Sequence, residues 1–143
     1  MLENLKAAIF EVLETMFFLF PESLEEVGEE STGEALRAWV PVTGSRSYHA
    51  GLTVPMPLAQ KMAANFLGCR EEEVTSQEME DIVREAANMV TGNFLSREQV
   101  PGAFRPEAPR SERIAGGAPR SPGHRLLFMV DDHLMEVFLE RIA

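Results

Sequence analysis

One stretch of the sequence places polar side chains at regular helical spacing. Asp81, Glu85, Asn88 and Gly92 follow one another at intervals of four, three and four residues. At about 100° per residue, this spacing stacks them along one face of a helix. The face lies opposite Met79 and the other apolar residues, so a carboxylate and a carboxamide are expected in solvent, one turn apart. We predict that this helix carries the function by presenting these side chains to a protein partner.

The spacing of Glu85 and Asn88 is weak evidence when it is taken alone. Many surface helices carry Glu-x-x-Asn by chance. Here an aspartate stands one turn before the pair and a glycine one turn after it. Asn88 is also a poor helix former at an exposed position within a helix. These neighbours favour a functional interpretation.

Three helices are predicted from apolar residues that recur at helical spacing. The helix with the polar face begins at Thr75, where Glu78 follows at the spacing of a capping box, and ends near Gly92. A short helix over residues 57–68 precedes it. The first helix of the chain is expected over residues 2–19. Each has one apolar face and should pack on a sheet.

Two hairpins are predicted between and after these helices. Residues 35–42 alternate apolar and polar side chains, residues 47–54 follow as a partner strand, and Pro41 assigns the first strand to a sheet edge. The second hairpin joins residues 126–130 and 134–139. The order helix, hairpin, helix, helix, hairpin predicts an α+β fold, in which an antiparallel sheet is covered on one face by two long helices and a helix-then-strands unit is used twice.

Composition limits the classes of function. The chain has 143 residues, which suits a single domain, and its net charge of −10 disfavours binding to nucleic acid. No apolar run is longer than residues 16–20, which is far shorter than the ~20 residues that a membrane span needs. The N-terminus lacks the features of a secretory signal, so we expect a cytoplasmic protein. Residues 97–125 hold five of the nine prolines and are predicted to form a mobile loop whose arginines have no catalytic role.

No metal or cofactor of its own is expected for this chain. The single cysteine and the three histidines, His49, His124 and His133, show no spacing that is typical of metal ligands.

The polar helix also resembles a known family. Residues 81–93 read Asp-Ile-Val-Arg-Glu-Ala-Ala-Asn-Met-Val-Thr-Gly-Asn, which is similar to the signature helix of CheX and CheC chemotaxis phosphatases. The first helix ends in Glu14-Thr-Met-Phe, a strand ends in Gly51-Leu-Thr-Val-Pro and the short helix closes in Phe66-Leu-Gly, in the same order as in CheX-like proteins. The resemblance covers residues 2–95, returns at the terminal hairpin, and implies a CheC-like fold.

The resemblance implies a phosphatase that hydrolyses the aspartyl phosphate of a CheY-like receiver domain in chemotaxis or two-component signalling. The receiver would supply Mg²⁺. Glu85 and Asn88 would be the catalytic residues, with Glu85 pairing with a receiver lysine and Asn88 orienting the attacking water. Asp81 and Gly92 would have supporting roles. A homodimer formed by pairing sheet edges is also implied, and residues 134–139 could supply the edge.

Some family members carry the motif twice, but the first helix of this chain does not hold a second copy. Glu14 has the place of the glutamate, but Phe17 stands in place of asparagine and Phe10 in place of aspartate. One site per chain is therefore expected, as in CheX. The two phenylalanines point away from the predicted core stripe, so they either contact a partner or lie buried beneath a loop.

Two other classes of function stay open at this point. Related folds in flagellar switch proteins bind a regulator or each other without catalysis, and a non-catalytic scaffold would have a similar sequence. A homodimeric sensor of a small ligand is the third class. The presence of both Glu85 and Asn88 favours the enzyme.

Overall fold

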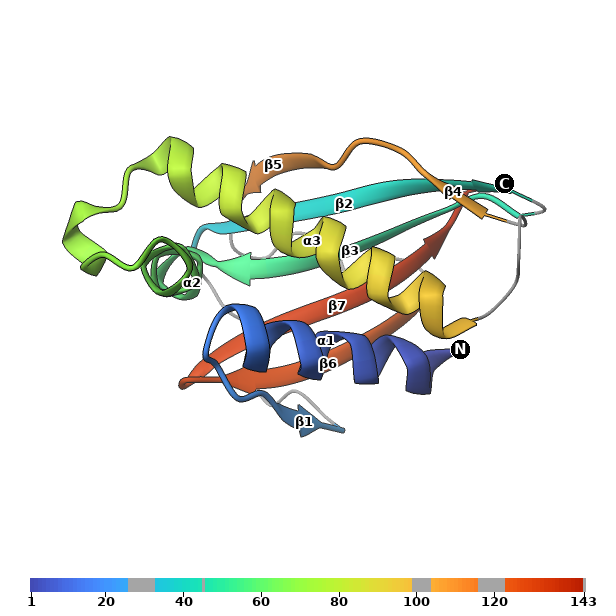
Figure 1. Cartoon of the computed structure of the whole chain (residues 1–143), viewed down its shortest axis with the longest axis horizontal. Helices are drawn as coiled ribbons and strands as arrows, with labels where there is room; N and C mark the ends of the chain where they lie inside the picture. The colour runs from blue at the N-terminus through green and yellow to red at the C-terminus, as the bar shows by residue number, and fades with distance from the viewer. Residues whose placement is uncertain (26–32, 45, 99–103, 116–122, 143) are drawn as a thin grey trace.

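Two helices lie across one face of an antiparallel sheet in the computed structural model, which describes residues 1–25, 33–44, 46–98, 104–115 and 123–142 (Figure 1). This arrangement confirms the predicted fold class. The elements in chain order are α1 (Leu2–Met16), β1 (Glu22–Leu24), β2 (Ala35–Gly44), β3 (Tyr48–Pro55), α2 (Met56–Leu67), the 3₁₀ turn η1 (Glu71–Glu73), α3 (Ser76–Glu98), β4 (Phe104–Pro106), β5 (Arg110–Ile114), β6 (His124–Val130) and β7 (His133–Arg141).

The sheet has the strand order β1-β6-β7-β3-β2-β4, and β5 also pairs with β2. Strand β7 therefore lies between β6 and β3, and the prediction that residues 134–139 supply a free sheet edge is wrong. The reason is that β7 is apolar on both faces. Met135 and Val137 are buried on one face and Phe138 on the other, so the strand belongs in the middle of the sheet.

The prediction that Pro41 assigns its strand to a sheet edge is also wrong. Strand β2 pairs with β3 on one side and with both β5 and β4 on the other. Residues 35–39 pair with β5 and residues 42–44 pair with β4, so Pro41 falls between the two. Its carbonyl accepts a hydrogen bond from the Glu107 amide at 2.8 Å. The missing N–H of the proline therefore interrupts no ladder.

Residues 97–125 do not form one long loop. Arg97 belongs to α3, β4 and β5 extend the sheet, and β6 begins at His124. Residues 99–103 and 116–122 lie outside the described part. Strands β4 and β5 are mostly exposed and lack apolar alternation, so pairing with β2 rather than their own pattern makes them strands.

The helix ends also differ from their predicted positions. Helix α1 ends at Met16 with Phe17 as its C-cap, because Phe18 takes the left-handed conformation with φ of 55°. Helix α3 continues past Gly92 to Glu98, because Phe94 prolongs its buried face. No helix in the described residues is long and apolar enough to span a bilayer.

Candidate functional site

Helix α3 is fixed at its start and along its inner face. The predicted capping box is present: the Thr75 amide donates to Glu78 Oε1 at 2.9 Å, and the Glu78 amide donates to Thr75 Oγ1 at 3.1 Å. The inner face packs on the sheet and on the neighbouring helices. Its buried residues are Ile82, Val83, Ala86, Ala87, Val90, Thr91 and Phe94. This packing holds the opposite face in a fixed orientation towards solvent.

The structure places Asp81, Glu85, Asn88 and Gly92 together on that outer face, and all four are exposed. Glu85 and Asn88 make no hydrogen bond or ion pair with another residue in the described part of the chain. A rigid helix therefore holds a carboxylate and a carboxamide that are both available to a partner.

Asp81 differs from the other three because its charge is already engaged. Its carboxylate forms an ion pair with Arg84, and Gln77 Nε2 donates to Asp81 Oδ1 at 3.0 Å. Arg84 also reaches the sheet, where its Nη1 donates to Ser111 Oγ at 2.6 Å. Sequence reasoning missed Arg84, although its spacing of three residues from Asp81 is typical of helical ion pairs.

Strand β5 flanks the first half of α3. Arg113 Nε lies 3.2 Å from Glu80 Oε1, and this ion pair joins β5 to α3 beside the contact between Arg84 and Ser111. Part of the segment that was predicted to be a mobile loop is therefore attached to the helix that carries the candidate site.

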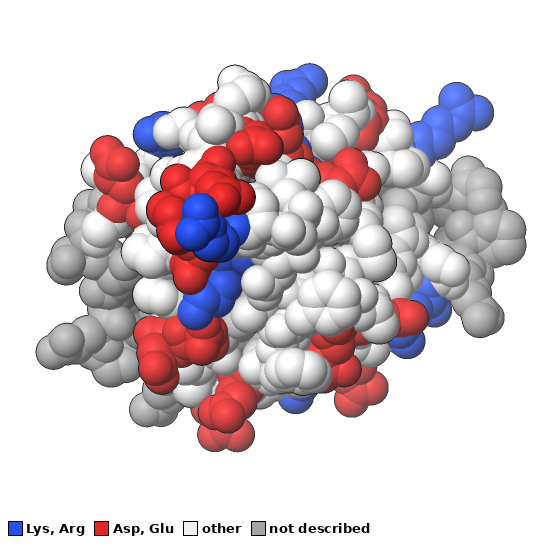
Figure 2. Space-filling model, turned by 60° about the vertical axis from the view of Figure 1, so that its left-hand side comes forward, with Lys and Arg blue, Asp and Glu red and all other residues white. Residues whose placement is uncertain are grey.

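The charge around the first half of α3 is strongly acidic. Between Glu71 and Glu85 the sequence has seven acidic residues and one basic residue. Figure 2 shows the side of the molecule where α2 leads into α3, and acidic side chains are prominent there beside an uncharged surface. An acidic surface attracts a basic group and speeds its approach.

No neighbouring atom in the described part of the chain requires residue 92 to be glycine. A Cβ atom built on Gly92 would meet no other atom within 4 Å. Glycine inside a helix costs about 0.5–1 kcal/mol relative to alanine. Its presence on the exposed face is compatible with a partner that approaches the helix backbone closely.

The corresponding positions of α1 do not form a second site. Glu14 is exposed, but Phe17 is fully buried and stacks on Phe66 of α2 with 5.4 Å between ring centroids. Phe10 is half-buried and packs edge-on against Phe128 of β6. Of the two alternatives for these phenylalanines, burial is correct. They are covered by α2 and β6 rather than by a loop.

The histidines lie on separate strands, with His49 in β3, His124 in β6 and His133 in β7. Burial is the main cause that lowers the pKa of His49. Within the described residues, no three His, Cys, Asp or Glu side chains are grouped as they would be around a metal ion.

Comparisons with known proteins connect this geometry to a family. The family model described as chemotaxis phosphatase CheX matches residues 36–112, more than half of the chain. Similar solved structures include CheX from Desulfovibrio desulfuricans, with 19% identity, a TM-score of 0.75, and coverage of 98% of this chain and 97% of that chain. CheX from Vibrio vulnificus has 22% identity, a TM-score of 0.75, and coverage of 96% and 95%.

A third similar structure is the CheX–CheY–BeF3–Mg²⁺ complex from Borrelia burgdorferi. It has 18% identity and a TM-score of 0.71, and the alignment covers 99% of this chain and 97% of that chain. The comparison with curated proteins gave no match.

Proposed function

This chain belongs to the chemotaxis phosphatase CheX family, and on that premise we propose that it hydrolyses the aspartyl phosphate of a CheY-like receiver domain through Glu85 and Asn88. The reaction takes place in the cytoplasm, where we expect the receiver. The receiver brings Mg²⁺, and this chain contributes side chains only. That the Borrelia burgdorferi relative was solved with CheY and Mg²⁺ supports this division of roles.

One observation carries the proposal: Glu85 and Asn88 are exposed one turn apart on a rigid helix, and neither has a partner among the described residues. Surface carboxylates near basic residues often form ion pairs, as Asp81 and Glu80 do here. A site that binds another protein must instead keep its side chains available. Glu85 and Asn88 meet that condition.

Asn88 acts on the attacking water. Phosphoryl transfer passes through a loose transition state, so the enzyme gains more from positioning the water than from a strong base. The carboxamide of Asn88 can accept a hydrogen bond from the water with its oxygen, and its fixed position on α3 holds the water in line with the phosphorus atom. No charge is needed for this task.

Glu85 holds the receiver. Its carboxylate pairs with the lysine beside the receiver's acyl phosphate, and this ion pair becomes stronger as docking excludes water. The acidic first half of α3 attracts that basic group during approach. Glu85 therefore contributes mainly to binding.

Asp81 and Gly92 support the site. Because Asp81 is already paired with Arg84, it positions that arginine between α3 and Ser111 of β5 instead of meeting the phosphoryl group. Gly92 leaves room for the receiver's backbone at the far end of the polar face.

The decisive experiment replaces Asn88 by alanine and measures phosphate release from a phosphorylated receiver. We expect the rate to fall by about 100-fold or more, since a misplaced water loses most of the benefit of positioning. Affinity for a receiver that carries beryllium trifluoride as an acyl-phosphate mimic should stay within about threefold, because Asn88 acts in the transition state. Alanine should also stabilise α3 by about 0.5 kcal/mol, so unfolding cannot explain the loss.

Asn93→Ala is the matched control, because it makes the same substitution on the same helix but off the polar face. It should keep a nearly wild-type rate. If Asn88→Ala hydrolyses the phosphorylated receiver as fast as wild type, α3 is only a docking surface and a non-catalytic scaffold replaces the enzyme.

A homodimer formed by pairing sheet edges is the second part of the proposal. Since β7 lies inside the sheet, we assign the pairing edge to β5, Arg110–Ile114, whose outer side has no strand beside it among the described residues. Light scattering at micromolar concentrations should give twice the mass of one chain. Glu112→Pro should shift that mass towards the monomer, because proline disrupts strand pairing. A monomer mass for the wild-type chain would contradict the proposed homodimer.

A further inference from the structure

A cavity lies at the opposite end of α3 from its cap. It has a volume of about 530 Å³, within the range of small-molecule sites, and sits where α1 begins, α3 ends and the β2–β3 turn meets β6 and β7. The nearest α3 residue of its lining is Phe94, which belongs to the buried inner face of the helix and lies six residues beyond Asn88, roughly 9 Å along the axis. The cavity is therefore separate from the proposed phosphatase site.

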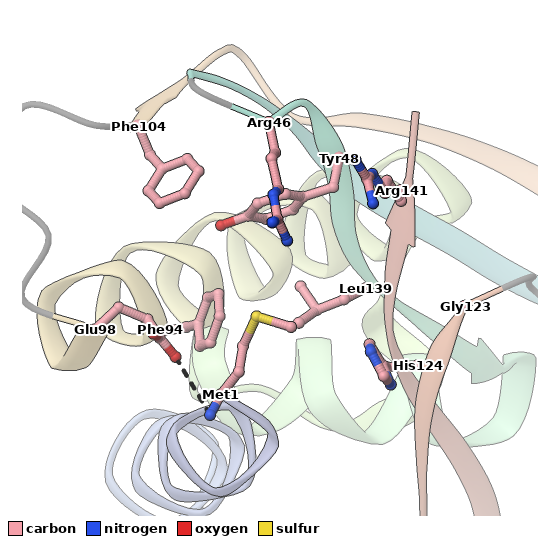
Figure 3. A pocket seen from close by; sticks show the side chains of 10 residues that line it. All are labelled: Met1, Arg46, Tyr48, Phe94, Glu98, Phe104, Gly123, His124, Leu139 and Arg141. Atoms are coloured by element: carbon pink, nitrogen blue, oxygen red, sulfur yellow. Dashed lines mark ion pairs between the residues drawn. The ribbon is translucent and has the colours of Figure 1, made fainter. Parts of the chain in front are cut away.

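The floor and one wall of this cavity are apolar. Phe94 of α3 and Leu139 of β7 are buried side chains that face it, and Phe104 of β4 stands half-buried at its rim. Tyr48 of β3 packs against Phe104 with 5.5 Å between the ring centroids. Figure 3 shows these side chains around a common space. Such a surface suits an aromatic or branched apolar group.

The rim carries positive charge that no described acidic side chain pairs with. The guanidinium groups of Arg46 and Arg141 have no ion pair or hydrogen bond with another described residue, and in Figure 3 Arg46 extends past Tyr48 towards the cavity. The one acid at the cavity, Glu98, is engaged: its Oε1 lies 3.8 Å from the Met1 amine and accepts from Asn4 Nδ2 at 3.2 Å. Two positive groups thus stay available in a chain whose net charge is −10.

The Tyr48 hydroxyl adds a neutral donor to the lining. Burial, and then the charge of Glu98, raise the pKa of Tyr48 to about 12, so its hydroxyl stays protonated at physiological pH. That hydroxyl has no hydrogen-bond partner among the described residues. It can therefore donate to an acceptor that enters the cavity.

We propose that this cavity binds a small organic anion with an apolar body, its acidic group held by Arg46 and Arg141 and its body packed on Phe94, Phe104 and Leu139. A guanidinium binds a carboxylate, sulfonate or phosphate oxygen well because its donors are fixed in a plane. A bare inorganic ion is not the preferred occupant, because such an ion would leave most of the cavity's volume unfilled and the apolar walls without a contact.

The test uses two fluorescent probes that share a ring system and differ in charge. These are 1-anilinonaphthalene-8-sulfonate, an anion, and N-phenyl-1-naphthylamine, its neutral counterpart. In a fluorescence titration the sulfonate should bind at one site per chain. The double variant Arg46→Gln/Arg141→Gln should weaken sulfonate binding at least tenfold and leave binding of the neutral probe within twofold.

Two control variants locate the probe. Lys6→Gln/Arg70→Gln removes the same amount of charge at surface positions outside the cavity and should leave both affinities unchanged. Phe18→Ser/Phe20→Ser removes the most exposed aromatic side chains, which are 66% and 71% exposed, and should also change neither. The proposal is overturned if the double arginine variant binds the sulfonate like wild type, loses both probes equally, or if the phenylalanine variant abolishes binding.

Probe binding to the cavity can be tested independently of the proposed phosphatase activity. None of these variants touches Glu85 or Asn88, so receiver dephosphorylation can be measured on the same proteins. Loss of probe binding with unchanged phosphate release supports a separate site, and the reverse outcome contradicts the cavity proposal without affecting the assignment of α3.

Discussion

Helices α1 and α3 lie on the same face of the sheet, and each carries a glutamate followed three residues later by the position that should hold asparagine. On α3 that position is Asn88, which is exposed, whereas on α1 it is Phe17, which is fully buried. The difference comes from what covers each helix. Phe17 is the C-cap residue of α1, and its amide still donates to the Leu13 carbonyl at 3.2 Å in the helical pattern. It is buried because α2 lies against it and Phe66 stacks on its ring, whereas nothing in the described residues covers Asn88.

The comparison shows that spacing after a glutamate does not by itself predict exposure, because neighbouring elements decide which positions of a helix stay in solvent. Glu14 is exposed like Glu85, but the residue three positions later is covered by α2. Asn65 Nδ2 fixes this geometry by donating to the Phe17 carbonyl at 2.8 Å. The position three residues after the glutamate therefore belongs to the core on α1 and to the candidate active site on α3.

The largest expected effect comes from giving α1 the missing asparagine. Phe17→Asn should lower the free energy of unfolding by about 3–5 kcal/mol, because it leaves a cavity beside Phe66 and buries an amide. It should add no phosphatase activity. Urea denaturation measures the loss, and phosphate release per folded molecule measures the activity.

Phe18→Asn is the matched control, since Phe18 is 66% exposed and already has a positive φ that asparagine tolerates well. Its stability should equal that of wild type or exceed it. A stable Phe17→Asn protein with a doubled rate would mean that α1 holds a latent second site.

The second largest effect is expected on receiver binding, and it should distinguish Glu85 of α3 from Glu14 of α1. Glu85→Ala should weaken binding to the receiver with its acyl-phosphate mimic by about 2–5 kcal/mol, at least about 30-fold, because it leaves the receiver lysine without its partner. Glu14→Ala should change nothing, although it removes an exposed glutamate from the neighbouring helix. Calorimetric titration of both variants checks this, and equal losses would show that the receiver docks across both helices.

A smaller effect is expected at Gly92. Gly92→Ala should raise the free energy of unfolding by about 0.5–1 kcal/mol, since the new methyl group meets no atom of the chain and glycine is a poor helix former. The same change should slow dephosphorylation several-fold by crowding the receiver. Thermal unfolding and phosphate release, measured together, separate the two. A stabilised protein with an unchanged rate would remove Gly92 from the site.

The smallest effect concerns a polar contact between α1 and α3. Glu11 Oε2 accepts hydrogen bonds from Asn93 Nδ2 at 2.7 Å and from Arg97 Nη2 at 2.5 Å, and these bonds lower the pKa of Glu11 below its ordinary value. A carboxyl group with a lowered pKa stabilises the fold above its unfolded pKa, and the contribution disappears as pH falls through the folded value. Asn93→Ala should raise the pKa of Glu11 towards its ordinary value, as followed by NMR titration. An unchanged pKa would mean that the helices are not joined there in solution.

Much of the candidate site could be predicted from sequence because it depends on residues within one or two helical turns. The capping box of Thr75 and Glu78, the exposure of Glu85 and Asn88, and the terminal hairpin are local features of this kind. In the hairpin, Asp131 and Asp132 both take the positive φ angles that such a turn needs, and these short polar residues tolerate them.

Only the tertiary structure decided which strands lie inside the sheet, where the helices end, and which charges are engaged. Strand β5 is polar and exposed, so nothing in its own sequence distinguishes it from a loop until β2 pairs with it. The bond from Arg84 to Ser111 and the cavity between Arg46 and Phe94 likewise join residues that are far apart in the chain. Such contacts depend on the packing of separate elements, which local spacing does not specify.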